Sequence, residues 1–265
     1  MIRSCANLLG GRSLEERRNH IPMSAEKTLD ILDLFDFDTR ALSVPQIADK
    51  LGQPQSSVYR HLRLLKEKGY VMESANGHYS LGYRFLKLAK IVRLDMNISA
   101  IAQPVMRSLT KDTGETSILL VHSNLQAVCL EAVPSHQPIK VSSEQGQIVP
   151  LYGGASSKAL LAYLGDEVLE GLFAAGHVRK HTDQTITDLA ALRADLVDIR
   201  AKGYAFSDGE IDEGVVSYGV PILDSNQQVA ASLSIAGPRD RMLEKDGKEL
   251  VAMLKAAVES IQRYL

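Results

Sequence analysis

The sequence has few cysteines, no long apolar run and no strong net charge, and each of these absences excludes a class of protein. Its 265 residues include two cysteines, Cys5 and Cys129, too few for a disulfide framework or a zinc finger. No run approaches the ~20 apolar residues of a membrane span, and the N-terminus lacks the apolar core of a signal peptide. We therefore expect a cytoplasmic protein that does not enter membranes. A net charge of −2 also excludes a nonspecific polycation.

The sequence also lacks a convincing catalytic or metal-binding pattern. His177 and His181 have the i, i+4 spacing of metal ligands on a helix, but their neighbours predict a loop and no glutamate completes a zinc-protease motif. The Ser-Ser-Lys sequence at 156–158 lacks the Ser-x-x-Lys spacing of a serine–lysine nucleophile. Residues 204–210 are expected to form an exposed loop. Two carboxylates in it, Asp208 and Glu210, are able to act as acid and base, although the usual role of such groups is that of a solvated loop. We predict no catalytic residue, metal or cofactor.

The most informative part of the chain is residues 53–80, which predict a helix followed by a small hairpin. At about 100° per residue, Val58, Leu62 and Leu65 fall on an apolar face opposite a polar one. Pro54 suits the first helical turn, and Gly69 suits a left-handed cap at the end. The polar face consists of Gln55, Ser56, Tyr59, Arg60, Arg63 and Lys66. One face packs, and the other is predicted to contact DNA.

The residues around this helix complete a winged helix-turn-helix pattern. After it, the Asn-Gly pair at 76–77 separates two short strand patterns, 70–72 and 78–80, and tolerates the backbone of a tight hairpin turn. Before it, apolar spacing predicts helices over 25–35 and 43–51. The order helix, helix, turn, helix, hairpin is that of a winged helix-turn-helix.

Positive charge is concentrated around the predicted recognition helix. From residue 53 to residue 93, eight cations and two acids give a formal charge of +6. The cations are Arg60, Arg63, Lys66, Lys68, Arg84, Lys87, Lys90 and Arg93, and the acids are Glu67 and Glu73. For any single cation a solvated helix face is the alternative, but a cluster favours duplex DNA, with an affinity that falls as salt rises.

Residues 83–95 predict a linker helix whose apolar side chains spread around most of its circumference. A small DNA-binding domain cannot bury such a helix alone, so we expect it to pack against the same helix of a second subunit. Packing within one chain is the alternative. A two-fold dimer would present two recognition helices to an inverted-repeat site. A further helix is predicted over 98–113, ending at Gly114.

Beyond Gly114 the pattern becomes α+β. Strands are predicted at 117–122, 127–131, 139–145, 215–223 and 228–236, and helices at 156–164, 168–175, 187–202 and 241–264. An antiparallel sheet with segregated helices is the layout of small-molecule sensor domains. Gly153 and Gly154 precede the first of these helices, where free N–H groups and the helix dipole favour an anion. The alternative is a turn that leads into the helix and binds no ligand. The residues alone do not decide between an anion site and such a turn.

Several separate segments resemble the IclR family of bacterial transcriptional regulators. They are Gln55–Leu62, Tyr79–Gly82, Leu151–Ala162, Gly203–Ala205 and Ser234–Pro238, in the family's order, and the resemblance covers nearly the whole chain from about Ser24. It implies a winged helix-turn-helix at 23–82, a linker helix at 83–97 and a GAF-like effector-binding domain at 98–265, assembled as a homodimer or homotetramer. Residues 1–22 are expected to form a tail, and translation from either Met1 or Met23 fits the pattern.

Two sets of site residues are expected: the predicted recognition helix gives the DNA-binding residues, and the resemblance implies the effector-binding residues. The DNA-binding residues are Gln55, Ser56, Ser57, Tyr59, Arg60 and Arg63. The effector-binding residues are Leu119 and Val121 as apolar walls, Gly154 and Ala155 at the helix start, and Leu151, Asp208, Ser217, Ser232 and Ser234 around them. In similar proteins a small organic or aromatic acid binds there and changes promoter binding. We expect backbone N–H groups to hold its acid group and Asp208 to accept a hydrogen bond from a ligand hydroxyl or amine.

The sequence departs from the family pattern at a few positions. Gln55 stands where the family often has lysine, and glutamine is able to pair bidentately with adenine. Gly209 replaces an acidic residue of the loop. Tyr152 and Tyr218 add aromatic bulk near the expected pocket and favour an aromatic or flat ligand. The interpretation is an effector-responsive DNA-binding regulator, more a repressor than an activator. The alternative is a small-molecule-binding protein or enzyme whose winged helix serves protein association.

Overall fold

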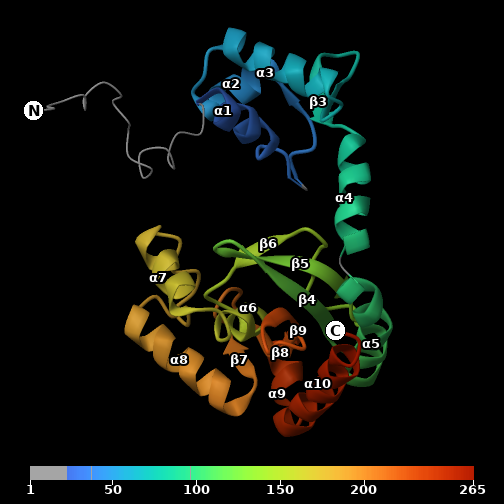
Figure 1. Ribbon diagram of the computed structural model, residues 1–265, viewed down its shortest axis with the longest axis vertical. Helices are drawn as coiled ribbons and strands as arrows, with labels where there is room; N and C mark the ends of the chain where they lie inside the picture. Colours follow the sequence, from blue (N-terminus) through green and yellow to red (C-terminus); the bar gives the residue numbers. More distant parts are fainter. Residues whose placement is uncertain (1–22, 37, 96) are drawn as a thin grey trace, which may run out of the picture. The chain divides into compact units, whose positions relative to one another are not determined.

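The computed structural model describes residues 23–36, 38–95 and 97–265, and the expected tail at 1–22 lies outside them. The chain divides between residues 95 and 96 into two compact units (Figure 1). That division falls inside the predicted linker. In the described part of the chain, no helix is long and apolar enough to cross a membrane.

The N-terminal unit is a winged helix-turn-helix. Its elements are α1 (Met23–Leu32), β1 (Leu42–Ser43), α2 (Val44–Leu51), α3 (Gln55–Glu67), β2 (Val71–Glu73), β3 (His78–Leu81) and α4 (Arg84–Asp95). The three strands form an antiparallel sheet in the order β1-β3-β2, so β1 adds an unpredicted strand beside the hairpin. Val58, Leu62 and Leu65 of α3 are buried against Ile31 and Ile47. The predicted fold of this region is confirmed.

Local chemistry explains the boundaries of these elements. Gln46 accepts a hydrogen bond from the Ser43 N–H at 2.8 Å, which satisfies a free donor at the start of α2. Pro54 caps α3. In the wing, Gly77 has a φ of 77°, a backbone conformation that glycine adopts without steric cost. The hairpin therefore turns where the sequence predicts it.

The C-terminal unit is built on one six-stranded antiparallel sheet with the strand order β6-β5-β4-β9-β8-β7. Its strands are β4 (Thr116–Ser123), β5 (Gln126–Val133), β6 (Ile148–Pro150), β7 (Ala205–Asp208), β8 (Val215–Leu223) and β9 (Val229–Pro238). Its helices are α5 (Asn97–Thr113), α6 (Ala155–Leu161), α7 (Asp166–Ala174), α8 (Leu189–Lys202), α9 (Arg239–Leu243) and α10 (Gly247–Gln262). The α+β class is confirmed.

The helices cover the two faces of this sheet separately. α5, α9 and α10 pack on one face, whereas α6, α7 and α8 pack on the other (Figure 1). Because successive side chains of a strand point to opposite faces, neighbouring residues enter different cores. Leu119 belongs to the core under α5 and α10, and Leu120 to the core under α6 and α8.

Three predicted elements of this unit differ from the structure. Residues 139–145 are not a strand, and a short strand, β6, lies at 148–150 instead. Part of the expected loop at 204–210 is the strand β7. The single helix predicted at 241–264 is divided into α9 and α10, because the Asp246 side chain caps a new helix by accepting from the Lys248 N–H at 2.8 Å.

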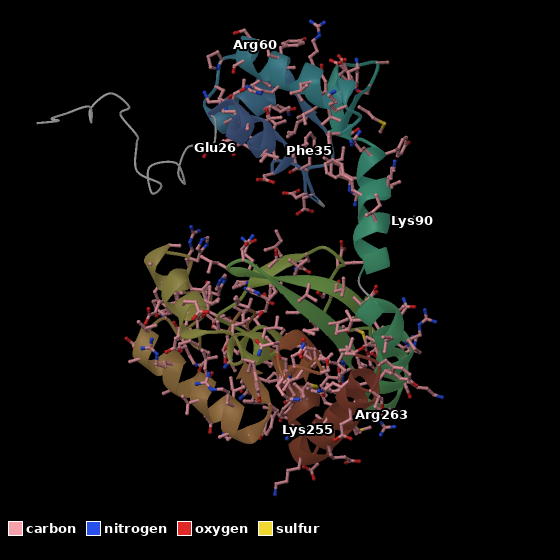
Figure 2. All side chains as sticks on the ribbon, in the orientation of Figure 1. Glu26, Phe35, Arg60, Lys90, Lys255 and Arg263 are labelled. Carbon is pink, nitrogen blue, oxygen red and sulfur yellow. The ribbon has the colours of Figure 1, made fainter. Side chains whose placement is uncertain are left out.

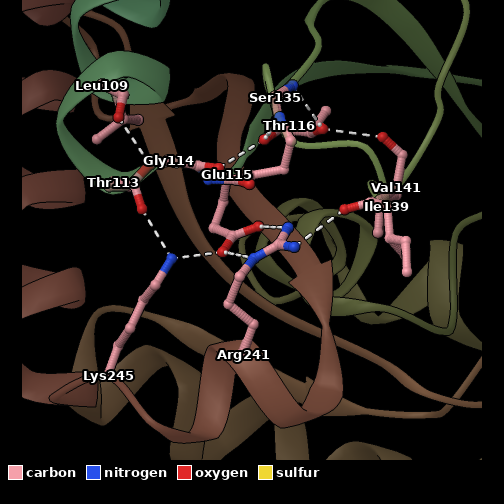
Figure 3. A network of polar contacts seen from close by, with 11 residues as sticks. Leu109, Thr113, Gly114, Glu115, Thr116, Ser135, Ile139, Val141, Arg241 and Lys245 are labelled. Atoms are coloured by element: carbon pink, nitrogen blue, oxygen red, sulfur yellow. Dashed lines mark hydrogen bonds and ion pairs between the residues drawn. The ribbon is translucent and has the colours of Figure 1, made fainter.

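Side-chain hydrogen bonds, rather than strand pairing, hold the segment at 139–141. Thr116 Oγ1 donates to the Val141 carbonyl at 2.8 Å, and Arg241 Nη1 donates to the Ile139 carbonyl at 3.0 Å (Figure 3). Arg241 also forms an ion pair with buried Glu115, whose carboxylate Lys245 contacts too. These polar contacts satisfy the backbone that a sheet ladder would otherwise satisfy.

Candidate functional site

The outer face of α3 is a surface of exposed polar side chains. Gln55, Ser56, Tyr59, Arg60 and Arg63 are exposed, and Ser57 is half-buried. Figure 2 shows Arg60 on the outer side of the helix. Tyr59 keeps 56% of its surface accessible although it is a large aromatic residue. The six residues predicted to bind DNA therefore share one accessible helix.

The cations around α3 differ in how they are engaged. Within the described residues, Arg60 and Arg63 form no ion pair. Lys66 Nζ lies 2.6 Å from the Glu73 carboxylate in β2, so its charge is partly neutralised. Arg84 lies over the Tyr70 ring, 4.9 Å from its centroid. Arg60 and Arg63 are thus the cations of this face that are available to a phosphate or a base.

One histidine on α3 is held in its neutral form. Burial lowers the pKa of His61 first, and the charges of Arg60 and Lys27 lower it further. Its Nδ1 lies 2.8 Å from Thr28 Oγ1 in α1. His61 consequently joins two helices and adds no charge to the surface at neutral pH.

The C-terminal unit contains a cavity of about 140 Å³ beside the N-terminal end of α6. Its lining comes from β4, β6, β7, β8 and β9 of the sheet, from the start of α6, and from the loops around residues 141–147 and 210–212. The close packing of α6 on β8 fixes the position of the cavity. A Cβ atom on Gly219 would lie 2.5 Å from the Ala155 carbonyl oxygen, so only glycine allows this approach.

The buried ammonium group of Lys158 in α6 forms an ion pair with Glu210, which lines the cavity. Lys158 Nζ lies 2.5 Å from Glu210 Oε1 and 2.9 Å from Asp195 Oδ2, and the lysine side chain is 2% exposed. The other oxygen of Glu210 accepts the Gly154 N–H at 3.0 Å. The Gly154 N–H, which was expected to hold a ligand's acid group, is therefore already engaged by a carboxylate of the protein itself.

Of the nine predicted effector-binding residues, four line this cavity: Gly154, Ala155, Ser217 and Ser234. Ser217 Oγ accepts a hydrogen bond of 3.4 Å from the Ala155 N–H. Leu151 and Ser232 are buried nearby but do not belong to the lining. Ser232 instead donates to the Ser156 carbonyl at 2.9 Å and holds the first turn of α6 on β9.

The expected apolar walls, Leu119 and Val121, lie on the wrong face of the sheet. Both belong to the core under α5 and α10, and Ile118 and Leu120 line the cavity in their place. A strand alternates its faces at every residue, so an error of one position moves a side chain through the sheet. Leu119 and Val121 therefore do not wall this cavity, and their role in effector binding stays a prediction.

Asp208 does not reach this cavity either, and its role in effector binding also stays a prediction. Its carboxylate pairs with Arg239, accepting from Nε at 2.9 and 3.1 Å, outside the cavity. Its neighbour Ser207 lies opposite Ser217 in the strand pairing and lines the cavity with it, as does Glu210. The polar composition of 204–210 indicated a site, but only the pairing of β7 with β8 shows which side chains reach it.

The two tyrosines expected near the ligand also lie elsewhere. Tyr218 packs against Phe206, with ring centroids 5.0 Å apart, in the group of residues that borders the α5 and α10 core. The Tyr152 hydroxyl lies 2.9 Å from His181 Nε2, at a separate surface depression. No aromatic side chain belongs to the lining among the described residues. Neither tyrosine therefore favours an aromatic ligand in this cavity.

The two histidines with metal-ligand spacing do not form a metal site. His177 and His181 follow the end of α7 and lie outside any helix. In the part of the chain that the structure describes, no group of three or more His, Cys, Asp or Glu side chains is arranged to hold a metal ion.

Comparison with family models settles what this combination of units is. The model for the IclR helix-turn-helix domain matches residues 24–74, and the model for the bacterial transcriptional regulator IclR C-terminal domain matches residues 92–263, more than half of the chain. The chain belongs to the IclR family. The resemblance read from the sequence is confirmed.

Relatives within the IclR family match over nearly their whole length. The HTH-type transcriptional regulator KipR of Bacillus subtilis is 30% identical, over 90% of this chain and 95% of that protein. The acetate operon repressor of Salmonella typhimurium is 29% identical, over 91% and 89%. A crystal structure of a putative IclR regulator from Silicibacter sp. superposes with a TM-score of 0.80 at 30% identity, covering 91% and 95%. These relatives are regulators, not enzymes, and the chain is a DNA-binding transcriptional regulator.

Proposed function

We propose that this IclR-family protein is an effector-responsive repressor that binds an inverted-repeat promoter site in the cytoplasm. The observation that carries the proposal is the accessible face of α3, on which Arg60 and Arg63 are exposed and unpaired among the described residues. Arginine pairs bidentately with guanine and with phosphate, so these side chains suit base reading in the major groove. Relatives named as repressors support the sign of regulation.

The surface of α4 supports assembly into a homodimer or homotetramer. Tyr83, just before α4, is 74% exposed, and Leu86 and Ile91 within it are 69% and 46% exposed. Exposing several large apolar side chains on one short helix is unfavourable in water, and a second copy of α4 would cover them. A two-fold pair of recognition helices would then match an inverted repeat.

The effector we propose is a small organic acid in the cavity beside α6. Its lining combines aliphatic side chains with hydroxyl groups, the composition of a small-molecule site. Because no aromatic residue belongs to the described lining, an aliphatic acid is favoured over an aromatic one.

A DNA-binding assay tests this function. Fluorescence anisotropy with DNA from upstream of the protein's own gene should show a discrete complex that weakens as salt rises. Arg60→Ala should cost about 1–3 kcal/mol of binding free energy, because it removes a contact to a base or phosphate.

Lys248→Ala is the matched control, because it removes an exposed cation from α10, far from α3 in the sequence. It should leave DNA affinity unchanged. An Arg60→Ala protein with full affinity would exclude α3 as the reading helix. The lack of any discrete complex would instead favour a carrier whose winged helix serves protein association.

A further inference from the structure

Hydroxyl groups dominate the polar lining of the cavity beside α6. Seven serines line it, and they come from α6, β7, β8, β9 and the loop at 141–147: Ser142, Ser143, Ser156, Ser157, Ser207, Ser217 and Ser234. Ligand sites usually carry only a few polar groups on a mainly apolar wall. This concentration of one functional group therefore calls for a chemical reason.

Several of these hydroxyls already have partners within the protein. Ser156 donates to Ser234 at 2.5 Å, Ser143 donates to Gln147 at 3.3 Å, and Ser217 accepts from the Ala155 N–H. These bonds satisfy the wall of the cavity and position its side chains. They leave a smaller set of hydroxyls to be explained.

Ser157 and Ser207 line the cavity with hydroxyls that are not engaged elsewhere among the described residues. Their residues are 2% and 4% exposed, they line the cavity, and neither hydroxyl has a hydrogen bond to any described residue. Neither oxygen is among the buried side-chain atoms without a partner in the described residues, so both hydroxyls are open to the cavity. A hydroxyl both donates and accepts hydrogen bonds, so a ligand hydroxyl would match these two serines.

The remaining lining specifies the carbon skeleton. It is aliphatic, with Ile118, Leu120, Val149, Ile211 and Val215. The cavity volume of about 140 Å³ is close to that of a protein cavity that admits benzene, so the ligand has roughly six to ten heavy atoms. The space suits a short aliphatic chain.

Charge does not explain recognition at this cavity. The lining carries two acids, Glu210 and Asp212, and no Lys, Arg or His among the described residues. Nearby Lys158 is turned to Glu210 and Asp195. An acid group on the ligand would gain little from this environment. The carboxylates of Glu210 and Asp212, in contrast, are able to accept hydrogen bonds from hydroxyl groups of a ligand.

We propose that the effector is a small aliphatic compound bearing hydroxyl groups, recognised by the side chains of Ser157 and Ser207. The inference rests on the proposed function, because it takes this cavity as the effector site. It narrows the organic acid of that proposal to a hydroxy acid, or replaces it with a neutral polyol. Both share the chemistry that the two serines recognise.

Calorimetric titration of the full-length protein tests the ligand class. The probes are three- to six-carbon hydroxy acids and polyols, such as glycerate and glycerol, each beside its deoxy counterpart, such as propionate, with benzoate as the aromatic member. A hydroxylated probe should bind at least about tenfold more tightly than its deoxy counterpart, since one additional hydrogen bond is worth about 1.4 kcal/mol. Glycerate binding without glycerol binding would identify the acid, and the reverse would identify the polyol.

Serine variants test the residues. Ser207→Ala and Ser157→Ala should each reduce the preference for the hydroxylated probe by about tenfold while leaving the deoxy counterpart unaffected. Ser260→Ala on α10, where the hydroxyl bonds only its own helix, is the matched control and should change nothing. Thermal unfolding confirms that each variant is folded.

Equal affinity for hydroxylated and deoxy probes, tighter binding of benzoate, or no binding of any hydroxylated probe at millimolar concentration would overturn the inference. None of these outcomes affects DNA binding by α3, so the regulator function would stand without it. Loss of the discrete DNA complex would instead count against the proposed function, whatever the cavity binds.

Discussion

At the scale of single residues, Lys158 positions a carboxylate of the cavity lining, that of Glu210. Its ammonium lies between Glu210 and Asp195, almost fully removed from solvent. Burying a charge is unfavourable unless it is paired, and here the pairing also fixes the Glu210 carboxylate against the Gly154 N–H. The sequence predicted only that Ser-Ser-Lys is not a nucleophile, whereas the structure shows what the lysine does.

Replacing Lys158 with methionine should destabilise the protein by about 3–5 kcal/mol, because it leaves a buried carboxylate without its counterion. Urea unfolding followed by circular dichroism measures the loss. Lys202→Met is the matched control, since its pair with Asp198 is exposed on both sides, and should produce no clear change. Equal losses in the two variants would mean that the buried pairing is unimportant.

Glu115 gives the protein a defined response to acid. Burial raises the pKa of its carboxyl, but hydrogen bonds from Arg241 and Lys245 outweigh burial and hold the pKa below the ordinary value (Figure 3). A carboxyl with a lowered pKa stabilises the folded state above its unfolded pKa of about 4.3 and loses this contribution as the pH falls through the folded value.

The unfolding free energy should therefore decrease as the pH drops below about 4.3. Glu115→Gln should be less stable than the parent at neutral pH, and the difference should narrow in acid, because the parent loses the same charge there. Denaturation across a pH series measures both curves, with Glu249→Gln on the surface of α10 as the control. A gap that does not change with pH would rule out Glu115 as the titrating group.

At the scale of elements, the predicted helices agree with the structure more closely than the predicted strands do. The apolar stripe of α3 and its flanking Pro54 and Gly69 are local signals, and α3 forms as predicted. Residues 139–145 have the composition of a strand but no partner to pair with, and their backbone is held by side chains. Strand pairing is a long-range event, so composition alone does not decide it.

The contact of α6 with β8 tests how closely the cavity is specified. Gly219→Ala would place a Cβ atom 2.5 Å from the Ala155 carbonyl, and backbone on both sides leaves little room to adjust. We expect a loss of about 1–3 kcal/mol in unfolding free energy and weaker ligand binding, as α6 is pushed from the sheet.

Gly171→Ala in α7 is the control for this substitution. The added methyl group would meet only the end of the Leu125 side chain, and alanine favours the helix. It should be neutral or stabilising. Thermal unfolding and calorimetry on both variants measure the two effects, and a Gly219→Ala protein with parental stability would show that α6 is not held closely.

At the scale of the whole molecule, the proposed regulation requires two copies. Leu86 is 69% exposed on α4, which makes it the clearest position for testing association. Leu86→Glu should shift the solution mass toward the monomer and weaken operator binding, because one winged helix reaches only half of an inverted repeat.

Light scattering coupled to size-exclusion chromatography measures the mass. Leu243→Glu on α9 is the control, since it also places a charge on an exposed leucine and should leave the mass unchanged. If Leu86→Glu retained the parental mass, α4 would not be the dimer contact. A monomeric parent protein would contradict the proposed assembly altogether.

Residue types and their spacing were sufficient to determine the winged helix and the α+β class, because helix periodicity, caps and turn residues are local and independent of distant partners. The family followed from the resemblance of several sequence segments in order. Only the tertiary structure decided which residues face the cavity. Leu119 and Asp208 were each one position from residues that do, Ile118 or Leu120 and Ser207. A strand changes face at every residue, and the pairing register that sets the face depends on chain segments far away in the sequence.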